Sequence, residues 1–191
     1  MLPEATAVRR RLEHAAFSVF RSWGYEEVVT PLFEYLDVIA PGLGPGLIEK
    51  AYTVADRGTG RVMVLRPDVT PQVARMAATL LRDAPRPMRL CYGANVFRYE
   101  DEHAGHEREI VQIGAELIGP SAPSADAEIV ALAMEVLGRF GLPGATVAMG
   151  HVGFFQGWLA ATGASPEGAA LLEEAVAKKD RTRVADLLRR D

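Results

Sequence analysis

The sequence predicts an α+β protein in which helices flank an antiparallel sheet. Two observations carry this prediction. Pairs of short apolar segments are joined by glycine-containing connections, and consecutive strands joined by short turns must run antiparallel. Around these pairs, apolar residues recur every three or four positions, which is the helical period. We expect one core domain over residues 1–152 and a small helical extension over residues 153–191, without an internal repeat.

The N-terminal part of the chain is expected to hold a helix, a strand and a second helix. Apolar residues at helical spacing, opposite an arginine-rich face, predict a helix over residues 4–23, ended by Gly24. The β-branched segment 25–31 predicts a strand that stops at its proline, which cannot donate to a ladder. Residues 32–40 have helical character. The glycines and prolines of residues 41–46 predict a loop.

Two hairpins are predicted in the middle of the chain. Residues 51–55 and 61–67 flank a connection with two glycines, which is typical of a hairpin turn. Residues 88–100 and 107–119 are apolar segments around the polar loop DEHAGH. The second hairpin is therefore expected to be the longer one.

A helix is predicted after each hairpin. Thr70 is suited to be the N-cap of the first, with Pro71 at the first helical position. Ser124 is suited to cap a helix over residues 125–140. Residues 146–152 then predict one more short strand, before two or three small helices that complete the chain.

The composition excludes several classes of protein. Hydrophobic residues make up 49% and charged residues 24% of the 191 residues, which is too apolar for a disordered chain. The net charge of -4 provides no field for a phosphate backbone, so tRNA is not expected as a partner. No signal-type apolar region and no membrane-spanning run is present, and the single Cys91 suits a small buried hydrophobe. We expect a cytoplasmic protein without a membrane partner.

Charged and amide residues interrupt the apolar strands of the longer hairpin. Residues two apart share one face of a strand, so Gln112, Gly114 and Glu116 line the same face. Arg98 and Glu100 share a face of the opposing strand. We therefore expect an arginine and carboxylates to converge on a floor of antiparallel strands, which suits a small zwitterion. The alternative is a lattice of surface ion pairs on a solvated face.

Three segments resemble motifs of the histidyl type of class II aminoacyl-tRNA synthetase. FRSWGYEEVVTPLFE resembles motif 1, RVMVLRPDVTPQVARMAA resembles the segment that holds the amino group of histidine, and RLCYGANVFRYEDEHAGHEREIVQIGAELIG resembles motif 2. The resemblance implies a class II synthetase-like antiparallel sheet flanked by helices. It also implies a homodimer formed through motif 1, with Trp23 and Pro31 at the interface.

The same resemblance implies a set of histidine-binding residues. Asp68 and Thr70 match the positions that hold the amino group of histidine, and a carboxylate suits an ammonium group. Arg98 matches the motif 2 arginine that contacts the α-phosphate and the carboxylate. Gln112 and Glu116 match two further histidine-binding positions. L-Histidine is therefore the ligand that the resemblance implies.

The motif 2 loop departs from the enzymes, which resemble one another in a basic loop of the form ERPQxGRYRQF. This chain reads EDEHAGHEREI, so that Asp101 and His106 stand at arginine positions and Arg108 remains. Losing cations and gaining an anion weakens the attraction of a triphosphate. Glu100, His106 and Arg108 are the loop residues that we expect to add to the site. No segment resembling motif 3 precedes Asp191, so the fold is expected to be truncated before motif 3, without catalytic residues, ATP or Mg²⁺.

A second resemblance concerns paralogues of histidyl-tRNA synthetase that serve as regulatory subunits of the short-form ATP phosphoribosyltransferase. RPDVTPQVAR, NVFRY and GHVGF are similar to segments typical of that family. It implies a non-catalytic subunit that senses histidine for allosteric control of the first step of histidine biosynthesis, with the catalytic subunit as partner. Two alternatives stay open: a histidyl-tRNA synthetase or fragment of one, using ATP and Mg²⁺, and a dimeric binding module without an enzyme partner.

Other residues were weighed as sites and set aside. His103 and His106 have a spacing that suggests a metal site, but no cysteine or third ligand accompanies them, so we expect no metal. Phe154, Phe155 and Trp158 are expected to anchor the terminal helices in a core. Exposed, they would instead form a partner surface.

Overall fold

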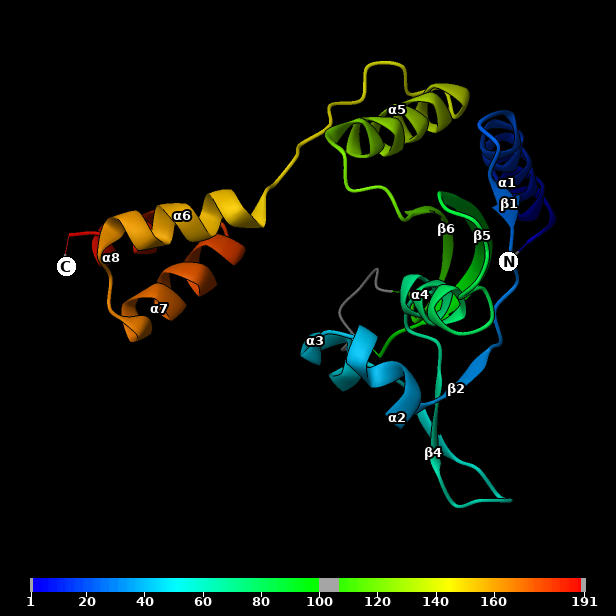
Figure 1. Cartoon of the computed structure of the whole chain (residues 1–191), viewed down its shortest axis with the longest axis horizontal. Coiled ribbons are helices and arrows are strands. Elements are labelled where there is room, and N and C mark those ends of the chain that lie inside the picture. The colour runs from blue at the N-terminus through cyan, green and yellow to red at the C-terminus, as the bar shows by residue number, and fades with distance from the viewer. Residues whose placement is uncertain (1, 100–106, 190–191) are drawn as a thin grey trace. The chain divides into compact units, whose positions relative to one another are not determined.

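The computed structural model describes residues 2–99 and 107–189, and the chain divides into two compact units, residues 1–145 and 146–191 (Figure 1). This division falls earlier than the boundary expected at residue 152. Helices and antiparallel strand pairs follow one another in nearly the predicted order. The α+β class is therefore confirmed.

Helix α1 (Pro3–Ser22) forms as predicted and ends where the backbone becomes left-handed. Its buried residues are Ala16, Val19 and Phe20, all on one face. Gly24 has a φ of +79°, which glycine adopts without steric cost, and so the chain leaves the helix there.

A long antiparallel hairpin forms the centre of the first unit. Strands β5 (Met88–Phe97) and β6 (Glu109–Ile118) pair along their whole length, with Tyr92 opposite Gly114. Strand β1 (Glu26–Glu27) pairs with β5 in parallel, which gives the order β1-β5-β6. The longer predicted hairpin is thus confirmed, whereas the strand predicted before Pro31 is regular over only two residues.

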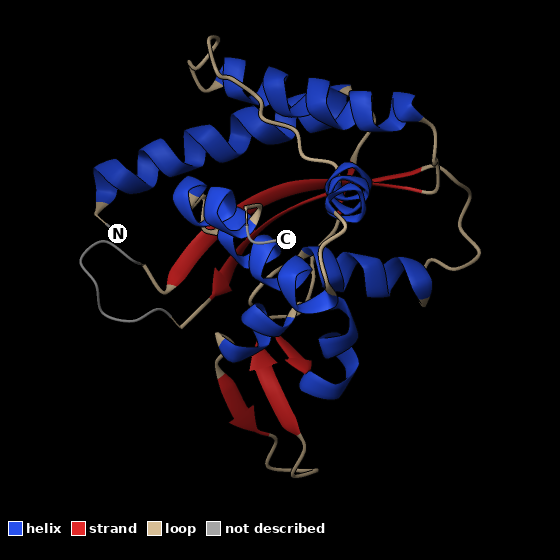
Figure 2. Ribbon diagram, turned by 90° about the vertical axis from the view of Figure 1, so that its left-hand side faces the viewer, coloured by secondary structure: helices blue, strands red, loops and turns tan. Residues whose placement is uncertain are grey.

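The two faces of this hairpin are covered by different helices. Helices α1 and α5 (Pro123–Arg139) pack on one face, and Figure 2 shows the long strands running beneath this pair. Helix α4 (Thr70–Ala78) packs on the other face. Cys91 belongs to the core under α1 and α5, whereas its neighbours Leu90 and Tyr92 belong to the core beside α4. The alternation of side chains along a strand therefore gives the hairpin two distinct faces.

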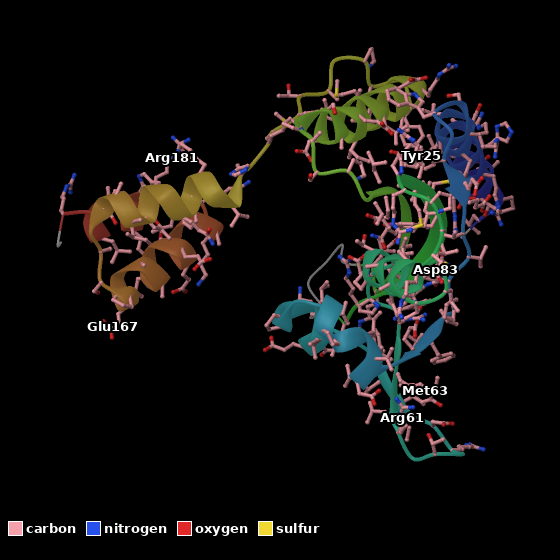
Figure 3. All side chains as sticks on the ribbon, in the orientation of Figure 1. Tyr25, Arg61, Met63, Asp83, Glu167 and Arg181 are labelled. Carbon is pink, nitrogen blue, oxygen red and sulfur yellow. The ribbon has the colours of Figure 1, made fainter. Side chains whose placement is uncertain are left out.

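The part of the chain between β1 and β5 forms a second sheet of shorter strands. Strands β2 (Phe33–Tyr35), β4 (Val62–Leu65) and β3 (Thr53–Ala55) form it in the order β2-β4-β3, with both pairings antiparallel. The predicted hairpin of β3 and β4 is confirmed. At its edge, the Arg61 side chain labelled in Figure 3 lies with its guanidinium carbon 3.7 Å from the centre of the Tyr35 ring.

The predictions for residues 32–46 are wrong in part. The expected helix over residues 32–40 begins with β2, because Phe33, Glu34 and Tyr35 find partners on β4, and only α2 (Leu36–Ile39) is helical. The expected loop contains η1 (Ala40–Gly42) and leads into α3 (Pro45–Glu49). Proline in the first turn of each short helix costs no hydrogen bond, which explains why this composition tolerates them.

The predicted helix caps are also wrong by one or two residues. Thr70 is the first residue of α4, after Val69, and α5 begins before Ser124, after Ala122. Each helix has a proline in its first turn, and the fixed φ of proline sets the start without a capping hydroxyl. At α4, the carboxylate of Asp68 accepts a hydrogen bond from the Thr70 N–H at 2.9 Å.

The strand predicted over residues 146–152 does not form. Residues 145–151 belong to no helix or strand, and α6 already begins at Val152. A strand needs ladder partners for its backbone groups, and no strand within the described residues pairs with this segment.

The second unit consists of the small helices that the sequence predicted. They are α6 (Val152–Thr162), α7 (Pro166–Ala177) and α8 (Arg181–Leu187). Ser165 caps α7 by accepting from the Gly168 N–H at 3.1 Å, and Asp180 caps α8 by accepting from the Arg183 N–H at 3.0 Å. Side-chain caps therefore mark the starts of both α7 and α8.

The aromatic residues of α6 differ from their predicted role. Phe155 and Trp158 pack against each other with ring centres 5.6 Å apart, but Phe154 is 77% exposed, so the core role expected for it is wrong. Helix α6 is apolar but has only 11 residues. Over residues 2–99 and 107–189, no helix has both the length and the apolar character needed to cross a membrane.

Candidate functional site

Polar side chains from the start of α4 and from both long strands meet on the face of the hairpin that α4 covers. Figure 1 shows α4 beside the β5–β6 hairpin. Hydrogen bonds and an ion pair join them into one group, here called the polar cluster: Asp68, Thr70, Tyr92, Arg98, Gln112 and Glu116. The structure thus brings the five sequence-predicted residues together and adds Tyr92.

Asp68 organises one half of the polar cluster. Its Oδ1 accepts a hydrogen bond from Gln112 Nε2 at 3.2 Å, and its Oδ2 lies 3.5 Å from Arg98 Nη2. Gln112 Oε1 in turn accepts from the Val69 N–H at 3.2 Å, so a donor and an acceptor fix the orientation of this amide. Arg98 Nε donates to the Pro67 carbonyl at 2.8 Å. This half is therefore held in place by the protein itself.

Tyr92 organises the other half. Its hydroxyl lies 3.2 Å from Thr70 Oγ1 and 3.4 Å from Glu116 Oε1. A Cβ atom at Gly114 would overlap the Tyr92 ring and hydroxyl, so glycine is required there by a close approach. Because Thr70 also donates its N–H to Asp68, the two halves are connected.

The polar cluster carries an excess of negative charge at neutral pH. The carboxylates of Asp68 and Glu116 face a single guanidinium, that of Arg98, and only Asp68 is paired with it. Within the part of the chain that the structure describes, Glu116 has no cationic partner. Burial raises the pKa of Tyr92 to about 12, so its phenol stays protonated. Thr70 is exposed, and the cluster is open to solvent.

Side chains of the first turns of α4 also bind the segment that resembles motif 1. The side chain of Gln72 is fully buried, and its Oε1 accepts from Thr30 Oγ1 at 2.7 Å. Gln72 Nε2 donates to the Pro31 carbonyl at 2.8 Å and to Glu34 Oε1 at 3.0 Å. Arg75 Nη2 donates to the same Glu34 oxygen at 2.6 Å. One helix therefore positions both the polar cluster and the backbone of Pro31.

The two residues expected at a dimer interface have different surroundings. Trp23 is half-buried in the core under α1 and α5, and its indole N–H donates to Glu135 Oε2 at 2.8 Å. Pro31 is exposed, as are its neighbours Val29 at 86% and Phe33 at 41%. The surroundings of Pro31 are therefore more open than those of Trp23, and a contact of Trp23 and Pro31 with a second chain stays a prediction.

Of the loop residues expected to add to the site, Glu100 and His106 lie outside the described residues. Arg108 is described, and its guanidinium carbon lies 5.1 Å from the centre of the Tyr99 ring. With Arg9 of α1, it lines a cavity of about 530 Å³. Arg108 pairs with Arg98 through its backbone at the end of the hairpin, and its contribution to the site stays a prediction.

The histidines and the cysteine show no arrangement for chemistry in the described residues. In residues 2–99 and 107–189, no three His, Cys, Asp or Glu side chains are grouped to hold a metal ion. His151 caps α6, where its Nδ1 accepts from the Phe154 N–H at 3.1 Å, while His103 and His106 lie outside the described part. Cys91 is buried, as predicted, and burial raises the pKa of its thiol to about 11.

Tyr92 is the residue of the polar cluster that sequence reasoning missed. The segment RLCYGANVF reads as a plain apolar strand, and a tyrosine there is typical of a core. The signal becomes visible only when the hairpin is put in register, because Tyr92 then lies opposite Gly114, between Gln112 and Glu116 on the polar face. An aromatic residue opposite a glycine on a polar face indicates that the ring fills the space above that glycine.

Comparison with known proteins agrees with this architecture. The "ATP phosphoribosyltransferase regulatory subunit" of Syntrophotalea carbinolica is 41% identical over 187 residues, which are 98% of this chain and 44% of that protein. That of Symbiobacterium thermophilum is 43% identical over 180 residues, 94% of this chain and 45% of that protein. The chain therefore spans less than half the length of these curated relatives.

A solved structure and a family model complete the comparison. The crystal structure of an "ATP phosphoribosyltransferase regulatory subunit/histidyl-tRNA synthetase" from Bacillus halodurans matches with a TM-score of 0.88 at 30% identity, over 97% of this chain and 47% of that one. The predicted class II aminoacyl-tRNA synthetase-like fold is confirmed by this match. The family model described as histidyl-tRNA synthetase matches residues 1–191. The chain belongs to the histidyl-tRNA synthetase family.

Proposed function

We propose that this chain is part of a non-catalytic regulatory subunit of ATP phosphoribosyltransferase, which senses L-histidine in the first step of histidine biosynthesis. The convergence of Asp68, Thr70, Arg98, Gln112 and Glu116 in one solvent-accessible group is the observation that carries the proposal. The names of the relatives support the regulatory role. The chain needs no cofactor for this role, which we assign to the cytoplasm.

A histidine zwitterion offers three groups that the polar cluster can bind. The ammonium faces Asp68 and the Thr70 hydroxyl, and the carboxylate faces the guanidinium of Arg98. The imidazole contacts Gln112 and Glu116. Asp68 Oδ2 and Arg98 Nη2 lie 3.5 Å apart. The two charges that would bind the ammonium and the carboxylate of the ligand are therefore already neighbours.

Regulation requires that histidine binding changes the state of a partner. The partner in this proposal is the catalytic subunit of ATP phosphoribosyltransferase, and the coupling is a difference in histidine affinity between two states of the assembly. A homodimer through the segment that resembles motif 1, with Trp23 and Pro31 at the interface, is a further part of the proposal. The exposure of Pro31 and of its neighbours Val29 and Phe33 supports it. Co-purification of the chain with a catalytic subunit at micromolar concentration tests the partner, and repeated failure would favour a binding module without an enzyme partner.

Calorimetric titration with L-histidine tests the site. Gln112→Ala and Glu116→Ala are each expected to weaken binding at least tenfold, because each removes a charged or orienting hydrogen bond of about 1.5–3 kcal/mol. Gln156→Ala, at an exposed position on α6, is the matched control and is expected to leave the affinity unchanged. Histidine binding that survives both site substitutions contradicts the assignment.

The second candidate is an enzyme that activates histidine with ATP and Mg²⁺, as a histidyl-tRNA synthetase or part of one. The family model and the double name of the Bacillus halodurans structure favour keeping it. Histidine-dependent exchange of labelled pyrophosphate into ATP distinguishes the two. We expect no exchange from this chain, whereas exchange that Arg98→Ala abolishes would favour the enzyme.

A further inference from the structure

The hydroxyl of Tyr92 has an unusual position for a buried phenol. The residue is only 4% exposed, yet its hydroxyl touches two polar cluster residues, Thr70 at 3.2 Å and Glu116 at 3.4 Å. A phenol has one proton to donate, and an ionised carboxylate can only accept. The phenol therefore donates to Glu116 and accepts from the Thr70 hydroxyl.

The direction of these two hydrogen bonds determines which donors and acceptors remain available to a ligand. The Thr70 proton is used on Tyr92, so Thr70 Oγ1 offers only lone pairs to the solvent side. Glu116 Oε1 receives the phenol, and its Oε2 stays available as an acceptor. The raised pKa of Tyr92, about 12, keeps the phenolic proton in place across the neutral range. Both atoms at this end of the polar cluster are thus acceptors, and one carries a negative charge.

We propose that Tyr92 is a specificity-determining residue, which sets the Thr70 hydroxyl and the Glu116 carboxylate as hydrogen-bond acceptors so that this end selects a ligand presenting an N–H donor. The inference rests on the proposed histidine site and deepens it. Tyr92 acts through its two neighbours, as a positioning residue beneath the ligand. The chemical class that it selects is an amino acid whose side chain carries an N–H group.

Gly114 allows the Tyr92 hydroxyl to reach this position. It lies between Gln112 and Glu116 on the polar face, and the phenol occupies the space where a side chain would otherwise stand. A larger residue there would push the hydroxyl away from Thr70 and Glu116. The sequence pair of Tyr92 and Gly114, opposite each other across the hairpin, is thus what places the donor.

The test compares L-histidine with its two ring-N-methylated forms at pH 8. The imidazole pKa is about 6.5, so at this pH the ring is neutral and has one N–H, which methylation of either nitrogen removes. Wild-type chain is expected to prefer histidine to both methylated forms. Tyr92→Phe keeps the ring but removes the hydroxyl that donates to the Glu116 carboxylate. It is expected to bind histidine about tenfold more weakly and to reduce the preference by a similar factor.

Tyr25→Phe is the matched control. Tyr25 is 2% exposed and its hydroxyl lies 3.1 Å from Glu128 Oε1, so it loses the same kind of hydrogen bond away from the polar cluster. It is expected to leave the preference for histidine unchanged. Thermal unfolding shows that the variants are folded. Glu116→Gln, which replaces the accepting carboxylate by an amide of similar shape, provides a second variant with the same expected loss of preference.

The outcomes separate this inference from the proposed function. If histidine binds and Gln112→Ala weakens it, but Tyr92→Phe keeps the wild-type preference, the role of Tyr92 is refuted and the site stands. If wild-type chain binds no histidine, the proposed function fails and this inference fails with it. Loss of the preference in Tyr92→Phe and Glu116→Gln, but not in Tyr25→Phe, supports it.

Discussion

Two buried tyrosines of the first unit each face a carboxylate, and their surroundings differ in one respect. Tyr25 donates to Glu128 at 3.1 Å, and Arg89 binds the same carboxylate through Nε and Nη2 at 2.7 and 2.8 Å. Tyr92 lies 3.4 Å from Glu116, which has no cation among the described residues. A carboxylate neutralised within the chain ties elements together, whereas one that meets only a phenol keeps its charge for a ligand.

The same contrast extends to the two faces of the β5–β6 hairpin. The face under α1 and α5 is closed by an apolar core that includes Cys91 and Leu132. The face beside α4 carries the polar cluster in addition to an apolar core of its own. We therefore expect substitutions on the first face to change stability alone, and substitutions on the second to change ligand binding.

The largest expected effect on stability comes from the α1 and α5 face. Leu132 is 2% exposed, and Leu132→Ala is expected to lower the free energy of unfolding by about 3 kcal/mol, through lost burial and the cavity left behind. Urea unfolding measures the change. Leu171→Ala, at a residue 40% exposed, is the control with a small effect. If folded Leu132→Ala protein bound histidine more weakly than wild type, the expectation that this face affects stability alone would be wrong.

Gln72→Leu is expected to have the next largest effect. It removes the Gln72 hydrogen bonds to the Pro31 carbonyl, to the Thr30 hydroxyl and to Glu34, which keeps Arg75 as a partner. We expect this loss to cost roughly 2–3 kcal/mol of unfolding free energy. The same substitution at the exposed Gln156 is expected to cost little. A melting temperature equal to wild type would show that the network around Gln72 does not hold the segment near Pro31.

Gly114→Ala sharpens the comparison because a Cβ added at this position in β6 would meet Tyr92, a residue of the polar cluster. The added methyl group overlaps Tyr92, and overpacking of this kind is expected to cost about 1–3 kcal/mol and to reduce histidine affinity as well. Gly157→Ala in α6 meets open space and is the control. Calorimetric titration beside thermal unfolding separates the two effects, and unchanged affinity would contradict the role of the Tyr92 hydroxyl.

The smallest expected effect concerns acid stability. The hydrogen bond from Arg89 holds the pKa of Glu128 below its ordinary value near 4.5. A lowered folded-state pKa stabilises the protein above the unfolded pKa, and this contribution is lost as the pH falls through the folded value. Glu128→Gln is therefore expected to show a shallower loss of stability below about pH 4.5 than wild type. Glu173→Gln on α7 controls for removing a surface charge, and parallel profiles of wild type and Glu128→Gln would contradict this account.

Local patterns predicted much of this fold. The α1 helix, both hairpins and the C-terminal helices follow from periodicity and turn composition, because these elements make their hydrogen bonds nearby in sequence. Strand β2 was misread as helix because its partner β4 lies about thirty residues later, at Val64 opposite Glu34. Residues 146–152 show the reverse error, where a strand-like segment has no ladder partner among the described residues.

The candidate site was predictable where side chains share a strand and not where they meet across strands. Gln112 and Glu116 follow from alternation along β6, and the convergence of Asp68 required only that α4 cover the same face. Tyr92 required the register of β5 on β6, and the orientation of its proton required knowing both neighbours. The pairing of Arg98 with Asp68 likewise depends on the packing of α4 on the hairpin.

A crystal structure of the chain grown with L-histidine tests the central claim most directly. The account predicts the ligand on the polar cluster, with its imidazole N–H on the Glu116 carboxylate and its ammonium beside Asp68 and Thr70. Histidine bound instead at another surface, such as the cavity beside Arg108, with the polar cluster unchanged and occupied only by water, would contradict it.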